Sequence, residues 1–284
     1  MKRSKVIMLT THVDSHYEHP SRRSLQLMAD DLKSDWLPLW YEHDPRIPPS
    51  GRVIDGYLEE LEDGELALVG IVEQFEAHDV LPFDNSRAMK IVRAPAEVTV
   101  EFDRSYRDRK SQALIVDLAN LLGTEARSQA KKAHEPLSIL TLTVQATLGG
   151  IVGAVAKTVT DDIWLKLKKK ISLALVRRRD KGKEYVFQWR FVVIVGGREI
   201  EVDLLATAPS ESQLDRIFHR HLAATDAILL AWLPKHPEIR RVVFDVGGTE
   251  PRFSYALRSD VVTIYDGPEP EHDSQKAVGV KPHV

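Results

Sequence analysis

The chain of 284 residues is long enough for two domains, each with its own hydrophobic core. A hydrophobic content of 43% and a charged content of 29% are ordinary for a globular protein, and a net charge of −3 gives no reason to expect a nucleic-acid partner. The absence of cysteine excludes disulfides, thiolate metal sites and cysteine catalysis. The apolar run after the basic start is too short for a signal peptide, so we expect a cytoplasmic protein.

Residues 1–110 have the pattern of a small antiparallel β domain. Ser21 has the character of an N-cap, and apolar residues at helical spacing predict an amphipathic helix over residues 22–34. The dipeptide Asp63-Gly64 is a hairpin turn signal. The expected strands are residues 5–10, 37–41, 53–61, 66–75 and 96–102. Strands this close together favour an antiparallel barrel or sandwich with packed helices, in a chain whose overall class is α+β.

Residues 111–180 are expected to form a helical linker. Leucines at helical spacing predict a first helix over residues 111–132. Residues 137–156 contain no charge and are long enough to cross a bilayer, and they include a small-xxx-small pattern at Gly149 and Gly153. We interpret them as an apolar Gly-rich helix that is either buried or inserted in a membrane. Residues 161–176 predict a basic amphipathic helix, which suits an anionic membrane surface, a partner groove or a solvated face.

The region 181–266 has the element order of a ββαββ domain. Two alternating strands meet at the turn Gly196-Gly197, and Ser210 with Gln213 fits a capping box that opens a helix. The expected strands are residues 185–195, 200–206, 239–246, 252–257 and 261–265. The tail 267–284, rich in Pro, Glu, Gly and His, has the composition of a disordered end.

Residues 36–53 give the strongest signal of a functional site, because a His43-Asp44 pair precedes a proline-rich turn that ends at Gly51. This segment, together with the acidic hairpin turn at Gly64, resembles the motifs of the phage prohead (capsid maturation) proteases, whose fold is related to the herpesvirus assemblin serine proteases. The resemblance covers residues 1–110 and implies a barrel-like β domain with a His-based site. The family's serine motif is degraded in the strand around Thr99, where threonine replaces the serine.

The chemistry that the resemblance implies is hydrolysis of a peptide bond by a hydroxyl nucleophile. Such a nucleophile needs a base within hydrogen-bond reach, and the base needs an orienting group. We expect Thr99 as the nucleophile, His43 as the base and Asp79 as the orienting group. The extra methyl group of threonine crowds the attack and weakens such a site. Further candidates are Glu101 and His12 for the orienting group and Ser105 for the hydroxyl.

Two other interpretations of these residues remain open. In a structural interpretation, His43 and Asp44 fix the proline-rich turn, and Thr99 is an ordinary β-branched strand residue. In a metal interpretation, His43 joins an H-x-D-x-H string, whose residues are His12, Asp14 and His16. This string departs from the known zinc hydrolase patterns, and a polar loop with three histidines is more often solvated. We therefore expect neither a metal site nor a cofactor.

Taken together, these patterns predict a prohead-protease-like protein that binds or cleaves a protein substrate, as a serine/threonine-type peptidase or as a pseudoenzyme. The alternative is a non-enzymatic, membrane-associated effector or anchor protein of a phage or a defence system. That protein would lie at the inner face of the membrane, attached through residues 137–176. Either protein could form a homo-oligomer, and neither needs a nucleic acid.

Overall fold

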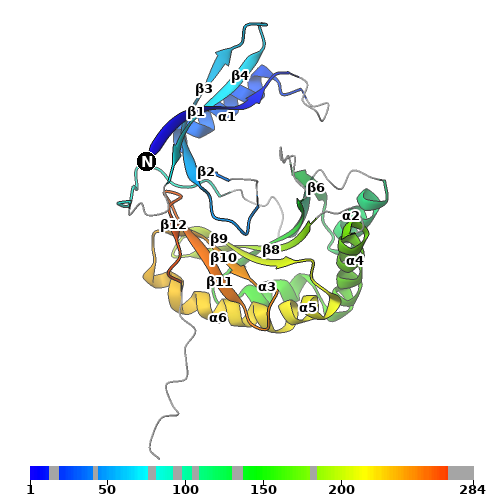
Figure 1. Cartoon of the computed structure of the whole chain (residues 1–284). Helices are drawn as coiled ribbons and strands as arrows, with labels where there is room; N and C mark the ends of the chain where they lie inside the picture. Colours follow the sequence, from blue (N-terminus) through cyan, green and yellow to red (C-terminus); the bar gives the residue numbers. More distant parts are fainter. Residues whose placement is uncertain are drawn as a thin grey trace, which may run out of the picture.

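The computed structural model describes residues 1–12, 19–40, 44–75, 81–91, 98–103, 109–129, 137–179 and 184–267. In this part of the chain the fold is mixed α+β, as the sequence predicts, and the strands form a smaller and a larger sheet (Figure 1). The smaller sheet contains β1 (Lys2–Thr10), β2 (Leu37–Leu39), β3 (Gly51–Glu60) and β4 (Leu66–Gln74). The larger sheet contains β5 (Val98–Asp103), β6 (Ala126–Gln129), β7 (Leu137–Thr147), β8 (Glu184–Val195), β9 (Arg198–Thr207), β10 (Ile239–Asp245), β11 (Arg252–Arg258) and β12 (Thr263–Ile264).

The helices are distributed unequally between the two sheets (Figure 1). One helix, α1 (Arg22–Ser34), packs on the smaller sheet. The larger sheet is covered by α2 (Arg109–Leu121), α3 (Ile151–Thr158), α4 (Asp161–Arg179), α5 (Glu211–Arg216) and α6 (Leu222–Trp232). A π-helical turn, Ile217–His221, joins α5 to α6, so these two elements form one long rod.

The smaller sheet is antiparallel and has the open order β1-β4-β3-β2. The hairpin between β3 and β4 turns at Gly64, whose φ of 82° lies in the left-handed region that glycine reaches without strain. Helix α1 begins at Ser21, whose side chain accepts a hydrogen bond from the Ser24 N–H. Its buried residues Leu25 and Leu32 pack in one apolar cluster with residues of β3 and β4, which fixes the helix on this sheet.

The larger sheet is built from three successive βαβ units whose parallel strands are neighbours. These units are β5-α2-β6, β7-α3-α4-β8 and β9-α5-α6-β10. The hairpin β8-β9 joins the second unit to the third, and the turn at Gly196 and Gly197 has positive φ at both residues, as the sequence signal requires. The full order is β12-β11-β10-β9-β8-β7-β5-β6.

The helices lie on one face of the larger sheet, and the main core is between them and the sheet. A stack of aromatic rings runs through this core. Trp164 of α4 stacks on Phe218 with ring centroids 4.4 Å apart and on Trp189 of β8 at 5.8 Å. Trp189 in turn stacks on Phe191 at 5.8 Å. Alternation along β8 places Trp189 and Phe191 on the helix side, so Arg190 between them points to the opposite face.

The prediction of a single helix over residues 137–156 was wrong. Residues Leu137–Thr147 form β7, which pairs with β5 on one side and with β8 on the other, and the helix α3 begins only at Ile151. Residues 137–147 contain β-branched residues at alternate positions, which favours a strand. A strand in the middle of a sheet that is covered on both faces has a continuous apolar sequence, which resembles that of a buried helix. Gly153 faces open space, so no close helix approach occurs there among the described residues. None of the described helices has the length and the apolar character needed to cross a membrane.

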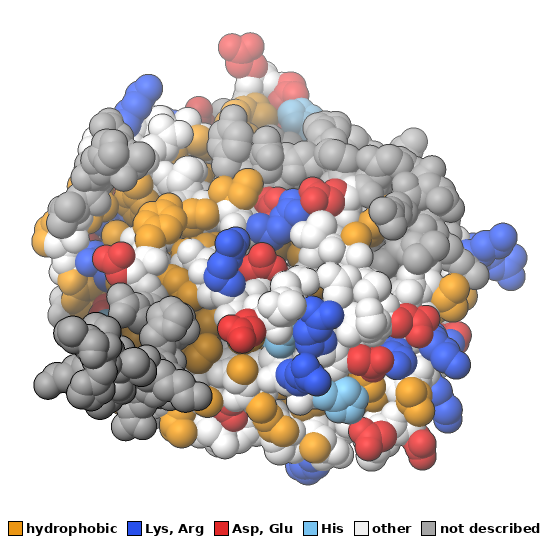
Figure 2. All heavy atoms as spheres, turned by 60° about the horizontal axis from the view of Figure 1, so that its bottom comes forward, with side chains coloured by type: hydrophobic (Ala, Val, Ile, Leu, Met, Phe, Trp, Pro, Cys, Tyr) orange, Lys and Arg blue, Asp and Glu red, His pale blue; other side chains and the backbone are white. Residues whose placement is uncertain are grey.

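The basic helix α4 directs its apolar side into the core of the protein. Trp164, Leu167 and Ile171 are buried against the larger sheet. Two of its lysines form ion pairs, Lys168 with Asp215 at 2.5 Å and Lys170 with Asp117 at 2.6 Å. On the helix-covered side of the molecule, basic and acidic side chains are interspersed (Figure 2). The buried apolar residues of this helix therefore face the larger sheet, while Leu165 and Leu173 remain about half exposed.

The larger sheet takes strands from both sides of the expected domain limits at residues 110 and 180. The alternating strand around Thr99 is β5, which pairs with β6 and β7 and not with the N-terminal sheet. The helix predicted over residues 111–132 ends at Leu121, and β6 follows it. The segment 111–180 therefore contains two strands besides its helices. From β8 to β11 the chain has the order strand, strand, helix, strand, strand, within this same sheet.

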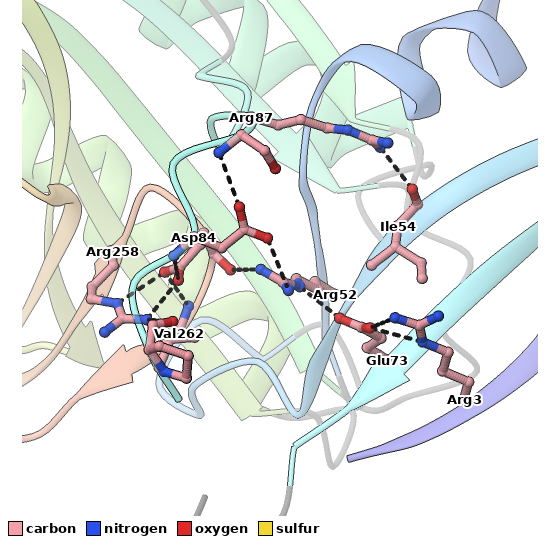
Figure 3. Close-up of polar contacts among 11 residues, drawn as sticks. Arg3, Arg52, Ile54, Glu73, Asp84, Arg87, Arg258 and Val262 are labelled. Carbon is pink, nitrogen blue, oxygen red and sulfur yellow. Dashed lines mark hydrogen bonds and ion pairs between the residues drawn. The ribbon is translucent and has the colours of Figure 1, made fainter. Parts of the chain in front are cut away.

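A buried arginine connects the N-terminal sheet to the end of β11. Arg52 donates to the Glu73 carboxylate at 3.0 Å and to the carbonyl oxygen of Asp260 at 3.0 Å, and its guanidinium lies 4.0 Å from the centroid of the Trp36 ring. Arg3 closes the group with a 2.6 Å bond to Glu73 (Figure 3). We call these residues the Arg52 network. It fixes the smaller sheet over the face of the larger sheet that the helices leave uncovered.

Candidate functional site

The face of the larger sheet opposite the helices carries a band of polar side chains across its central strands. Paired residues of neighbouring strands point to the same face. One row therefore runs from Thr99 through Thr143 and Arg190 to Asp203, and a second from Glu101 through Thr141 to Gln188. Glu201 and Arg241 pair beside these rows. We call this surface the polar sheet face; its residues are Thr99, Glu101, Thr141, Thr143, Gln188, Arg190, Glu201, Asp203 and Arg241.

Asp203 is the centre of a charge cluster on this face and has no exposed surface. Its carboxylate accepts a 2.8 Å hydrogen bond from Nε of Arg190 and forms an ion pair with Nη2 of Arg241. A second carboxylate, Glu201, lies 3.6 Å from Nη1 of Arg241. Burial alone would raise the pKa of Asp203, but the two guanidiniums outweigh it and hold the pKa below its ordinary value. The cluster is therefore charged at neutral pH, and the two arginines are fixed in position.

Four buried polar atoms of the same face have no hydrogen-bond partner among the residues that the structure describes. These atoms are Oγ1 of Thr99, Oγ1 of Thr143, Nε2 of Gln188 and Nε of Arg241. Thr99 is 1% exposed and Thr143 3%, so water does not replace the missing partners freely. A buried donor or acceptor without a partner costs about 1–3 kcal/mol, and such groups are rare in native proteins. Their concentration on one face makes this face the candidate site.

The N-terminal unit, which comprises the smaller sheet, α1 and the segment between β2 and β3, forms one wall beside this face. The Trp40 ring lies 4.9 Å from the guanidinium of Arg241 and 6.5 Å from the ring of Tyr255. The Tyr255 hydroxyl donates a 2.8 Å bond to the carbonyl oxygen of Pro45, and burial raises the pKa of this hydroxyl. Arg46 donates to Glu184 at 2.7 Å, at the beginning of β8. The proline-rich segment is therefore held against the larger sheet at several points.

The structure places some of the predicted site residues and not others. Thr99 lies in β5 and points to the polar sheet face, and Glu101, two residues further along, shares that face and adds a favourable electrostatic interaction with Arg190. The predicted base and orienting group, His43 and Asp79, lie outside the described residues, as do Ser105, Asp14 and His16. A hydrogen bond between the Thr99 hydroxyl and the His43 ring therefore stays a prediction.

Two further expectations concern the turn and the metal. Asp44 accepts hydrogen bonds from the backbone N–H and the guanidinium of Arg46, so it fixes the turn as the structural interpretation requires. His12 lies beside the hairpin of the smaller sheet, where its Nε2 is 2.7 Å from a carboxylate oxygen of Asp63. In the described ranges no three His, Asp or Glu side chains are grouped so that they could hold a metal ion.

Sequence reasoning missed the charged half of the polar sheet face. Arg190, Asp203 and Arg241 lie in strands that are otherwise rich in Val, Leu and Phe. The signal was present in the sequence, because polar or charged residues recur at period two in Gln188 and Arg190 and again in Glu201 and Asp203. Interior strands have little reason to carry charges unless these are paired or bind a ligand.

Comparison of the chain with protein-family models, with curated proteins and with solved structures found no match. Function therefore has to be inferred from the polar sheet face, where several buried polar groups of the described residues lie together without satisfying one another.

Proposed function

We propose that the chain is a ligand-binding protein whose polar sheet face takes up a small, oxygen-rich molecule. The observation that supports this is the set of four buried atoms without a partner among the described residues, on Thr99, Thr143, Gln188 and Arg241. The guanidinium nitrogen and the two hydroxyls can all donate to oxygen acceptors, such as those of a carboxylic acid, a sugar or a nucleotide. The carboxylate of Glu201, in the same band, can accept a bond in return.

The fixed charges around Asp203 suit such a role. Because Arg190 and Arg241 are both held by one carboxylate, their remaining N–H groups are oriented before a ligand arrives. A site that is already ordered loses less conformational entropy on binding. The Trp40 ring beside Arg241 adds an aromatic wall, which suits a ligand that has an apolar or planar part.

The test uses variants in which valine replaces threonine with almost no change of shape. Thr99→Val and Thr143→Val remove hydroxyls that have no partner among the described residues, so each variant should unfold at a higher urea concentration, with a gain of about 1 kcal/mol. Thermal shifts should be measured against a panel of nucleotides, sugar phosphates and carboxylic acids. At least one compound class should raise the melting temperature of the parent and leave the double variant unchanged.

Thr141→Val is the control for this test, because the Thr141 hydroxyl donates a 3.0 Å bond to Gln188. This variant should lose stability where the other two gain it. A loss of stability in Thr99→Val and Thr143→Val as well would show that their hydroxyls have structural partners, and the proposed site would lose its basis.

A second candidate function is the threonine-type peptidase that the resemblance implies, with Thr99 as nucleophile and His43 as base. The supporting observation is that the Thr99 hydroxyl has no partner in the described part of the chain and points to the side of the sheet against which Trp40 lies. Since β5 pairs with β6 and β7, such an enzyme would combine a nucleophile from the larger sheet with a base from the N-terminal unit.

The two candidates respond differently to a serine at position 99. In a peptidase, Thr99→Ser removes the obstructing methyl group and should speed self-cleavage or cleavage of a test protein, followed by mass spectrometry. Thr99→Ala and His43→Ala should both abolish it. If the serine variant and the parent leave all proteins intact while the thermal shifts of the ligand test persist, only the ligand-binding function stands.

A further inference from the structure

A pocket of about 750 Å³ lies where the segment 81–91 meets the ends of β10, β11 and β12. No residue of the polar sheet face lines it, so this pocket is independent of the site proposed above. Its wall consists of Phe83, Asn85, Arg87, Ala88, Pro237, Glu238, Arg240, Arg258, Ser259 and Ile264. The volume falls within the range of small-molecule sites in proteins, and the wall combines apolar side chains with a few polar ones.

Three arginines line this pocket, and two of them are already engaged. Arg258 makes a two-pronged ion pair with Asp260, at 2.9 and 2.6 Å, and also bonds to the carbonyl oxygens of residues 81 and 82. Arg87 donates a 2.7 Å bond to the carbonyl oxygen of Ile54 (Figure 3). Their side chains are therefore ordered, while their positive charge still acts on the space between them.

The third arginine, Arg240, is different. Its Nη1 is inaccessible to water and has no hydrogen-bond partner among the described residues. Burial lowers the pKa of its guanidinium, and the neighbouring positive charge of Arg198 lowers the pKa further. Both effects mean that the charge of Arg240 is uncompensated, which is costly in the free protein. Arg240 also lines the pocket, so an anion bound there would compensate its charge.

The local backbone gives an independent reason to regard Arg240 as placed for a ligand. The pairing of β10 with β11 shifts register between Ile239 and Arg241, so Arg240 is the extra residue of a β-bulge. Ile239 points to the main core and Arg241 to the polar sheet face. A bulge interrupts the alternation of a strand and re-aims one side chain, and bulges are frequent next to functional sites. Here it directs the third arginine to the pocket.

We propose that this pocket binds a small molecule that carries an oxyanion, a phosphate or a carboxylate, next to an apolar or aromatic part. The guanidinium of Arg240 pairs with the oxyanion, since its planar fork of N–H groups matches both phosphate and carboxylate oxygens. Asn85 and Ser259 are polar residues of the same wall, and Phe83, whose ring is 47% exposed, offers an apolar surface for the rest of the ligand.

The experiment compares phenyl phosphate, benzoate, inorganic phosphate and the uncharged benzyl alcohol by isothermal titration at low ionic strength. The parent protein should bind phenyl phosphate or benzoate more tightly than inorganic phosphate and should not bind benzyl alcohol. The better of the two aromatic anions identifies the oxyanion. Arg240→Gln should weaken that binding at least tenfold, and added salt should weaken it in the parent. Arg220→Gln, which changes an exposed arginine on the helix side, is the matched control and should bind like the parent.

A second measurement separates binding from folding. Because Arg240 is uncompensated, the ligand-free Arg240→Gln variant should melt at a higher temperature than the parent, and its circular dichroism spectrum should be unchanged. Equal binding by parent and variant, or no binding of any anion by the parent, would overturn the proposal. A lower melting temperature of the ligand-free variant would also overturn it, because Arg240 would then have a structural partner.

Discussion

Asp203 shows how one side chain determines the behaviour of its neighbours. It is completely buried and forms the shorter ion pairs of two arginines, for which Glu201, at 4.0 Å from Arg190 and 3.6 Å from Arg241, is the second carboxylate. Removing one partner of a buried charge group costs far more than replacing the whole group, because the remaining charge has lost its solvation. The polar sheet face is therefore stable only while this carboxylate is present and ionised.

We predict that Asp203→Asn lowers the free energy of unfolding by about 3–5 kcal/mol, as measured by urea denaturation at pH 7. The amide has nearly the shape of the carboxylate but no charge to balance Arg190 and Arg241. Asp30→Asn is the control, since the Asp30 side chain is 56% exposed and its ion pair with Lys33 is 3.5 Å long. The control should remain close to the parent, and a similar stability of both variants would contradict the role given to Asp203.

The pH dependence of stability follows from the same carboxylate. The folded-state pKa of Asp203 lies below its unfolded value, so its stabilising contribution is complete above the unfolded pKa of about 4. That contribution is lost as the pH falls through the folded-state pKa. The parent should lose stability below about pH 4, and Asp203→Asn should lose less over the same range. Parallel pH profiles of the two proteins would show that other carboxylates are responsible.

The packing of α1 on the smaller sheet depends on a glycine in β3. A Cβ atom added to Gly56 would lie 2.5 Å from Cδ1 and 3.1 Å from Cβ of the buried Leu32. We predict that Gly56→Val pushes α1 away from the sheet and lowers the free energy of unfolding by about 1–3 kcal/mol. Hydrogen exchange of α1 amides should accelerate, while the helices on the larger sheet keep the protection they have in the parent.

Gly153 provides the opposite case within a helix. Among the described residues, nothing lies within 4 Å of a Cβ atom added at this position of α3. Gly153→Ala should therefore raise the free energy of unfolding by about 0.5–1 kcal/mol, because alanine favours the helix and restricts the unfolded chain. Chemical denaturation measures this gain. A loss of stability would mean that the glycine is required for a contact of α3, as its small-xxx-small pattern had suggested.

Elements with local signals could be predicted from the sequence, and elements that depend on distant partners could not. The turn at Gly64, the N-cap of Ser21 and the capping box of Ser210 with Gln213 are confirmed, because each depends on residues a few positions apart. The strand β7 was mistaken for a helix, since its strand conformation depends on pairing with β5 and β8, which are distant in the sequence. Short apolar runs do not distinguish a buried strand from a buried helix.

The candidate site shows the same limit. Thr99 was selected from its alternating strand, and the structure places it on the polar sheet face. The arginines and carboxylates around it come from three other strands, and their proximity is a property of the sheet order. No spacing along the chain reveals that Arg190 and Arg241 share one carboxylate. They do so because β9, which carries Asp203, lies between their strands in the sheet.

At the scale of the whole molecule, the Arg52 network links the two sheets. Arg52 lies in the smaller sheet, yet it bonds to the backbone of Asp260, beyond the end of β11 (Figure 3). We predict that Arg52→Ala loosens the N-terminal unit, so that scanning calorimetry shows a broader transition at a lower temperature and proteases cut the 81–91 segment faster. The variant also leaves the buried Glu73 with one partner fewer, which adds to the destabilisation.

Arg3→Ala separates the link between the sheets from the ion pair itself. Arg3 bonds to the same carboxylate, but its side chain is 70% exposed and it does not take part in the contact with Asp260. Surface ion pairs contribute little to stability, so this variant should keep a single sharp transition close to that of the parent. A transition equally broadened by both substitutions would argue against a specific role for Arg52.

The outermost strand of the smaller sheet has a consequence for the behaviour of the protein at high concentration. β1 is nine residues long and pairs with β4 on one side, and in the described part of the chain no strand pairs with its other side, where a further strand could add. Lys2, Arg3 and Lys5 lie along this rim, and two molecules meeting there would bring like charges together. This repulsion opposes edge-to-edge aggregation of the protein, and it should weaken as salt is added.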